Sequence, residues 1–157
     1  MAVDLDPQDV KILTLLLGDG RLPASQIADS VGLSRPAVAE RIARLERDGV
    51  IRGTTAVVDP SALGRIITAF ISARGASISA AGWKRFRELL KSDEVLEAHT
   101  VAGDDCYLIK VRTASITSLN ELVSKLTAPP LSLSTRTTIV MQTHCEKVGG
   151  IILGEEP

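Results

Sequence analysis

Residues 31–50, VGLSRPAVAERIARLERDGV, predict a glycine turn followed by one well-capped helix. Ser34 is a favourable N-cap, because its hydroxyl can accept a hydrogen bond from a free backbone N–H of the first turn. Pro36 falls within that first turn, where its missing N–H costs nothing, and Gly49 is a favourable stop. We therefore expect a helix over residues 34–48.

This helix separates apolar from charged residues. At about 100° per position, Val38, Ile42 and Leu45 fall on one side and form a buried seam. The other positions carry small and charged side chains: Ala37, Glu40, Arg44 and Arg47 on the far side, Arg41 at the flank, and Arg35 in the first turn.

Arginine is the only cation of residues 34–52, which contain five arginines and three acids. The planar guanidinium suits both phosphates and the O6/N7 edge of guanine, so the helix is a candidate DNA-contacting element. The alternative is a solvated helix whose charges pair along it, as Arg44 with Asp48 or Glu40 with Arg44.

Two helices are expected before this one. In LDPQDVKILTLLLGDG (5–20), Asp6 can cap a helix with Pro7 in its first position and Asp9 in its first turn. A second short helix follows in PASQIADSVG (23–32), and its Gly32 supplies the turn. Two short helices, a glycine turn and a capped third helix outline a helix-turn-helix.

The hydrophobic period changes after Val50. A β-prone run (51–58) and a turn (59–64) connect to a second region. There we expect strand 66–74, helix 79–91, strands 95–102 and 105–113, helix 115–127 and strand 135–145. In helix 79–91 the inward side chains should be Trp83, Phe86, Leu89 and Leu90. The order βαββαβ is ferredoxin-like. The fold class is therefore α+β, with a helix-turn-helix domain (1–52), a linking strand and turn (53–64) and a ferredoxin-like domain (65–157).

Composition restricts the partners. The chain has 157 residues and a net charge of −1, so DNA binding requires a local basic patch. Residues 34–52 have a net charge of only +2, so one such module should bind DNA weakly. A dimer that places two of these helices about 34–36 Å apart would supply the missing affinity.

The N-terminus lacks a signal core and no stretch has about 18 apolar residues, so we expect a cytoplasmic protein without a membrane partner. In that compartment Cys106 and Cys145 should be free thiols.

The segment AGDDCYLIKV (102–111) allows several interpretations: a metal site, a catalytic acid pair, a redox thiol or a polar turn. Adjacent residues on a strand point to opposite faces, so we expect that Asp104 and Asp105 cannot act as a general acid and base on one bond. A metal or thiol sensor would need Asp104, Cys106, His144 and Cys145 to converge. In a ferredoxin-like sheet the first strand separates the strands that carry them. No catalytic residues, metal ligands or cofactor are therefore expected.

Several motifs lie in order along the chain: LDPQDVKIL (5–13), GDGR (18–21), VGLS (31–34), RIARLERDGVIRG (41–53), VLEAHTVAGDDCYLIKV (95–111) and TRTTIVM (135–141). At this spacing the sequence resembles the Lrp/AsnC, or feast/famine, family of transcription regulators over about residues 4–147. Two segments depart from the family pattern: Cys106 replaces the usual aspartate, and PPLSLS (129–134) replaces a "lpGV" segment. Because of the first departure, the identity of the small-molecule effector that the family binds stays open. Because of the second, the shape of the connection before the last strand stays open.

The resemblance implies a DNA-binding helix-turn-helix and a ligand-binding domain of the βαββαβ (RAM) fold. It implies dimers that assemble further, commonly to octamers, and an amino-acid effector that alters assembly or DNA binding. By position, the implied DNA contacts are Ser34, Arg35, Ala37, Val38, Arg41 and Arg44. The implied effector-binding residues are Thr100, Val101, Ala102, Gly103, Asp104, Asp105, Cys106, Tyr107, Thr137 and Ile139. An architectural DNA-binding protein without an effector is the alternative, followed by the thiol or metal sensor and a small enzyme.

Overall fold

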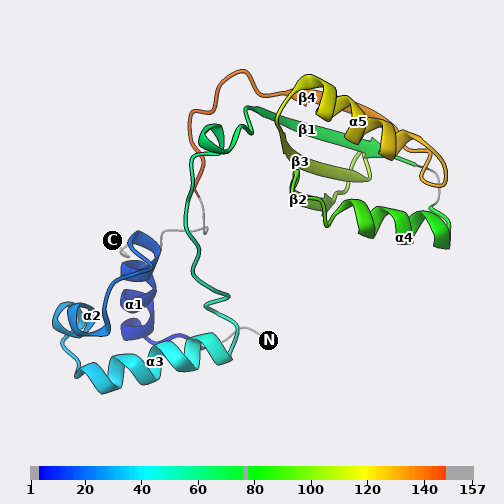
Figure 1. Cartoon of the computed structure of the whole chain (residues 1–157). Coiled ribbons are helices and arrows are strands. Elements are labelled where there is room, and N and C mark those ends of the chain that lie inside the picture. The colour runs from blue at the N-terminus through cyan, green and yellow to red at the C-terminus, as the bar shows by residue number, and fades with distance from the viewer. Residues whose placement is uncertain (1–3, 76–77, 148–157) are drawn as a thin grey trace. The chain divides into compact units, whose positions relative to one another are not determined.

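The computed structural model describes residues 4–75 and 78–147. These residues divide into two compact units, one that reaches to Val57 and includes Glu146 and Lys147, and one that spans Val58–Cys145 (Figure 1). The division lies inside the predicted linking segment, and the domain boundaries at residues 52 and 64 stay predictions. Each unit has its own hydrophobic core. No described helix is long and apolar enough to cross a membrane.

The N-terminal unit contains three helices, α1 (Pro7–Gly18), α2 (Ala24–Val31) and α3 (Arg35–Arg47). The predicted caps form. Asp6 and Asp9 make a reciprocal capping box at the start of α1, and the Ser34 hydroxyl accepts a hydrogen bond from the backbone N–H of Ala37 at 3.3 Å. Gly32 ends α2 in the left-handed region, with φ of 69°. The core of this unit consists of aliphatic side chains: Ile12, Ile27, Ala28, Val31 and Val38.

The second unit is a four-stranded antiparallel sheet with two helices (Figure 1). Along the chain its elements are a 3₁₀ turn (Pro60–Leu63), β1 (Ile67–Arg74), α4 (Ala80–Leu89), β2 (Val95–Thr100), β3 (Tyr107–Thr113), α5 (Ile116–Thr127) and β4 (Ser134–Ile139). The strand order is β2-β3-β1-β4, so β1 lies between β3 and β4. This is the predicted βαββαβ arrangement.

Strand alternation places the core on one face of this sheet. Buried alternate residues of β1 and β3 face the apolar residues of both helices. The cluster is completed by two leucines of the 128–133 turn; its members are Ala69, Ile71, Ala73, Phe86, Leu89, Ile109, Val111, Leu119, Leu122, Leu126, Leu131 and Leu133. The PPLSLS departure therefore supplies core side chains. The opposite sheet face is more open, and Phe70 there is 37% exposed.

The structure differs from the predicted strands at several points, and β2 ends at Thr100 rather than at residue 102. Among the described residues, 51–58 form no strand, because a strand requires a hydrogen-bonded neighbour and these residues join none of the four strands. β4 ends at Ile139, opposite Ala69, rather than at residue 145; one further hydrogen bond, from the N–H of Val140 to the carbonyl of Thr68 at 2.9 Å, follows it. β3 begins at Tyr107, two residues later than predicted.

The predicted inward face of α4 is correct for Phe86 and Leu89, and Leu90 packs against the same core. Trp83 is an exception, with 40% of its surface exposed. Its ring meets Phe86 edge-on at 5.9 Å and Tyr107 edge-on at 6.1 Å between centroids. Three of the four aromatic residues of the chain thus gather where α4 meets the sheet.

Candidate functional site

Helix α3 packs on α1 and α2 through the predicted seam. Val38 and Leu45 are buried and Ile42 is half-buried. Arg35 and Arg47 are exposed, and among the described residues neither forms an ion pair. The outer surface of α3 therefore presents free guanidinium groups.

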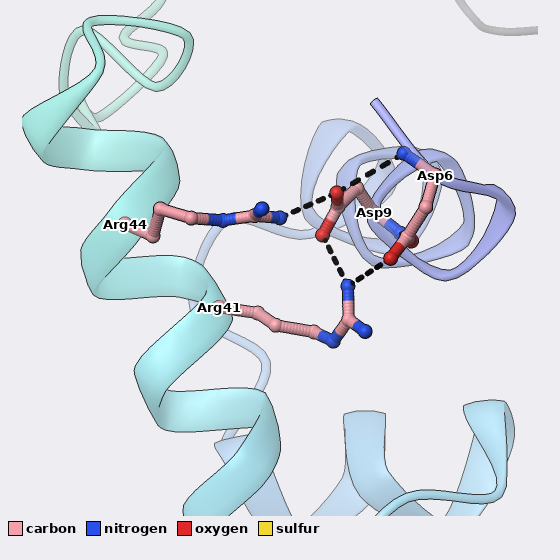
Figure 2. A network of polar contacts seen from close by, with 4 residues as sticks. All are labelled: Asp6, Asp9, Arg41 and Arg44. Atoms are coloured by element: carbon pink, nitrogen blue, oxygen red, sulfur yellow. Dashed lines mark hydrogen bonds and ion pairs between the residues drawn. The ribbon is translucent and has the colours of Figure 1, made fainter. Parts of the chain in front are cut away.

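Unlike Arg35 and Arg47, the side chains of Arg41 and Arg44 extend across to Asp6 and Asp9 at the start of α1 (Figure 2). Arg41 Nη1 donates to Asp6 Oδ2 at 2.6 Å and to Asp9 Oδ1 at 2.8 Å. Arg44 Nη2 donates to Asp9 Oδ2 at 2.5 Å. Asp9 also takes part in the capping box, receiving the N–H of Asp6 at 3.2 Å. The four side chains form one network, which we call the arginine clamp.

Burial makes the clamp energetically important. The Asp9 side chain is fully buried, whereas those of Arg41 and Arg44 are 28% and 41% exposed. Burial alone would raise the pKa of Asp9, but the hydrogen bonds from Arg44 and then Arg41 outweigh it, so the pKa lies below its ordinary value. The pKa of Asp6 is lowered first by its hydrogen bond from Arg41 and then by the backbone N–H of Asp9. Both carboxylates are thus stabilised in the charged form.

These lowered pKa values predict acid sensitivity of the N-terminal unit. An acid whose pKa is lower in the folded state stabilises that state fully at pH values above the unfolded pKa, here 3.8. The contribution is lost as the pH falls from that value through the folded pKa. We expect the midpoint temperature of thermal unfolding of the parent chain to fall when the pH is lowered below about 4. Asp9→Asn should flatten this part of the profile, and an unchanged profile would contradict the predicted linkage.

The clamp changes the interpretation of the predicted DNA contacts. Arg44 does not lie on the far side of α3, and neither of the two intrahelical pairs considered for it forms; it reaches Asp9 instead. Val38 is fully buried, so its side chain cannot contact DNA, and we remove it from the set. The hydroxyl of Ser34 serves as the helix cap. Arg35 is exposed and Ala37 half-buried, and both stay predictions.

The loop 101–106 joins β2 to β3 and contains most of the predicted effector residues. Its ends are closed by a hydrogen bond from the N–H of Val101 to the carbonyl of Cys106 at 3.0 Å, and the N–H of Cys106 donates to Ala73 at 3.0 Å. Gly103 has φ of 139°, a conformation that L side chains rarely adopt, and there is open space where a Cβ would lie. Ala102, Gly103 and Asp104 are exposed at the tip.

Two cavities adjoin this loop. A polar one of about 330 Å³ is lined by Arg74, Asp104, Asp105, Ser134, Thr135 and Arg136. A more apolar one of about 240 Å³ is lined by Trp83, Phe86, Arg87, Leu90, Ala98, His99, Thr100 and Tyr107. The predicted effector residues are therefore divided: the two acids line the polar cavity, and Thr100 and Tyr107 line the apolar one.

Thr137 and Ile139 line neither cavity. β4 runs antiparallel to β1, which places Ser134 opposite Arg74 but Thr137 opposite Ile71, further along the sheet. The start of β4 lies at the loop instead, and Arg136 Nη2 donates to Asp105 Oδ2 at 3.0 Å. Sequence reasoning missed Arg74 and Arg136. Arg74 is the last residue of the first predicted strand, and its neighbour Ala73 pairs with Tyr107, which directly follows the loop. A cation at the end of that predicted strand was the available signal.

The reason given against a catalytic acid pair is wrong. Asp104 and Asp105 lie in the loop, not on a strand, and both line the polar cavity. Asp105 is tied to Arg136, which suits binding charge better than transferring protons. Within residues 4–75 and 78–147, no three His, Cys, Asp or Glu side chains come together as metal ligands, and Cys106 and Cys145 are free thiols.

Comparison with known protein families agrees with this two-part structure. The winged helix-turn-helix DNA-binding family matches residues 5–52, and the Lrp/AsnC ligand binding domain matches residues 68–149, more than half of the chain. The chain belongs to the Lrp/AsnC family. It is a DNA-binding transcriptional regulator in which a ligand-binding domain follows the DNA-binding domain.

Named relatives of this Lrp/AsnC regulator include the HTH-type transcriptional regulator FL11 of Pyrococcus horikoshii. The two are 35% identical over 93% of this chain and 95% of the relative. The leucine-responsive regulatory protein of Klebsiella pneumoniae is 35% identical over 88% of this chain and 86% of the relative. Among solved structures, the feast or famine regulatory protein of M. tuberculosis complexed with L-methionine has a TM-score of 0.82 and 31% identity, covering 94% of this chain and 99% of that one. The relatives are named as regulators, which is consistent with a role other than catalysis.

Proposed function

We propose that this regulator binds a free amino acid in the polar cavity of the second unit, and that binding alters its affinity for DNA. The observation that supports this most strongly is the pairing of cationic and anionic groups around one small cavity: Arg74 and Arg136 against Asp104 and Asp105. The zwitterion of an amino acid carries an ammonium and a carboxylate group on one carbon. The ammonium group requires an anionic partner and the carboxylate a cationic one.

The role of each cavity residue in binding the effector follows from whether its charge is already paired. Asp105 and Arg136 neutralise one another at 3.0 Å. Arg74 and Asp104 are exposed, and among the described residues neither has an ion-pair partner. We assign the α-carboxylate of the effector to Arg74, whose guanidinium can donate two parallel hydrogen bonds, and the α-ammonium to Asp104. A cavity of about 330 Å³ is at the small end of ligand sites, as a single amino acid requires.

The names of relatives support an amino acid as the effector class. A structure of the M. tuberculosis relative contains L-methionine, and the K. pneumoniae relative is named for its response to leucine. The identity of the side chain is a separate matter, because Cys106 stands where the family usually has an acid. Its sulfur lies 3.9 Å from the Gly75 carbonyl, so the thiol is turned toward the end of β1.

A homodimer that assembles further completes the proposal. The sheet face opposite the helices carries the partly exposed Phe70, and an apolar side chain there is suited to an interface between copies. A dimer would place two α3 helices on successive turns of one DNA face, about 34–36 Å apart. Family resemblance makes an octamer the expected final assembly.

Titration of the full chain onto a duplex containing the DNA upstream of its own coding sequence tests DNA binding. We expect a discrete complex whose affinity falls steeply as salt rises, because each phosphate neutralised by arginine releases counterions. Absence of any complex with this duplex, at low as well as moderate salt, would contradict the proposal.

A further inference from the structure

The arginine clamp separates the cations of α3 into two classes. Arg41 and Arg44 are bound to the carboxylates of Asp6 and Asp9 at the start of α1, which lie 32 to 35 residues away in sequence. Arg35 and Arg47 have no ion-pair partner among the described residues. Val38 marks the inward side of α3, and Arg41, three positions later, lies on the flank toward α1. Arg47, nine positions from Val38, points in the opposite direction. Arg47 is therefore turned away from the buried seam, and Arg35 forms no ion pair with the acids that hold Arg41 and Arg44.

Exchanging Asp9 for a DNA phosphate would be unfavourable for Arg41 and Arg44. A phosphate offers these arginines the same kind of charged hydrogen bond that they already make. The exchange would leave the Asp9 carboxylate fully buried with its charge uncompensated. The free-energy cost of this is large, and the new bonds to phosphate do not offset it. The adjacent Asp6 and Asp9 charges also cancel most of the attraction between these guanidinium groups and DNA.

We propose that Arg41 and Arg44 are positioning residues, which hold α3 at a fixed angle on α1, and that Arg35 and Arg47 carry the contacts with DNA phosphates and bases. Arg35 lies in the first turn of α3, at the positive end of the helix dipole, which also attracts phosphate. This assignment rests on the proposed DNA-binding function. It removes two of the positions that the family resemblance alone suggested as contacts.

The salt dependence of DNA binding distinguishes the two roles. The slope of log affinity against log salt is about −0.9 for each phosphate neutralised, so losing one contact flattens it by about 0.9 per bound chain. We expect Arg35→Gln and Arg47→Gln each to flatten the slope in this way. Arg44→Gln and Arg41→Gln should instead give a line parallel to the parent, displaced to weaker binding by the same factor at every salt concentration. The probe is the labelled upstream duplex and the full chain.

Two further variants keep the test decisive when a glutamine variant unfolds. Asp6→Asn keeps the helix cap, since asparagine caps as well as aspartate, but removes one partner of Arg41. We expect a parent-like slope for it. Arg44→Lys restores a cation next to Asp9 without the planar fork, and should recover both thermal stability and affinity relative to Arg44→Gln.

A slope that flattens by about 0.9 per chain in Arg44→Gln or Arg41→Gln would overturn this inference. So would a steeper slope in Asp6→Asn, since it would show that Arg41, with one charged partner fewer, contacts DNA. An unchanged slope in both Arg35→Gln and Arg47→Gln would overturn the assignment of the contacts. Failure of the proposed function gives a different result, because the parent chain itself would then show no salt-dependent complex.

Discussion

Asp9→Ala is expected to lower the free energy of unfolding of the N-terminal unit by about 3 kcal/mol. The substitution removes the fully buried acceptor of Arg41 and Arg44 and one half of the capping box. The arginines that remain are partly exposed and can turn to water. The cost therefore comes from lost charged hydrogen bonds rather than from buried unpaired charge.

Hydrogen exchange of the amides of α1 to α3 is the suitable measurement, because a chain with two compact units need not unfold in one transition. Asp29→Ala is the matched control: Asp29 is an exposed acid of α2 without an ion-pair partner among the described residues. Its removal should change the free energy of unfolding by less than about 0.5 kcal/mol. Equal exchange protection in the two variants would show that the clamp does not stabilise the unit.

Arg74→Ala is expected to abolish the stabilisation of the second unit by its amino-acid effector. A ligand that binds only the folded state at about 100 times its Kd stabilises the parent by about 2.7 kcal/mol, and this stabilisation is readily visible in thermal unfolding. A panel of the standard amino acids, tested one at a time, should contain at least one that raises the midpoint of the parent. Without the Arg74 guanidinium the α-carboxylate loses its charged partner, and the shift should disappear.

Arg85→Ala provides the control for this variant. Arg85 lies on α4 of the same unit, is 43% exposed, forms a surface ion pair with Glu88 and lines neither cavity. Its loss should leave the ligand-induced shift intact. A shift that survives in Arg74→Ala, or that vanishes equally in Arg85→Ala, would place the effector outside the polar cavity.

Local chemistry made the elements predictable from the sequence. The capping residues Asp6 and Ser34 and the turn at Gly32 act within a few residues of their own position, so each can be recognised without knowledge of the fold. Strand alternation is equally local: along β1 and β3 every second residue is buried against the helices. Element ends were less predictable where they depend on a neighbour: the pairing of β4 with β1 ends at Ile139, opposite Ala69, and no glycine or proline in residues 135–145 marks this position.

The site residues required tertiary information. A helical wheel places Arg44 by its angle alone, but a long side chain can reach a partner on another helix, and Asp9 is 35 residues away. Arg74 and Arg136 join the loop acids only through the register of three strands, in which a shift by one residue would exchange the faces. The residue types were visible in the sequence, and their convergence was not.

The most direct measurement is the affinity of the full chain for its upstream duplex, at one fixed salt concentration, with and without the amino acid that gives the thermal shift. Because coupling between sites is reciprocal, we expect the Kd for DNA to change about 5- to 150-fold in the parent chain and to stay constant in Arg74→Ala. A Kd for DNA that no standard amino acid changes, or that changes equally in Arg74→Ala, would contradict an amino-acid-responsive regulator that uses the polar cavity.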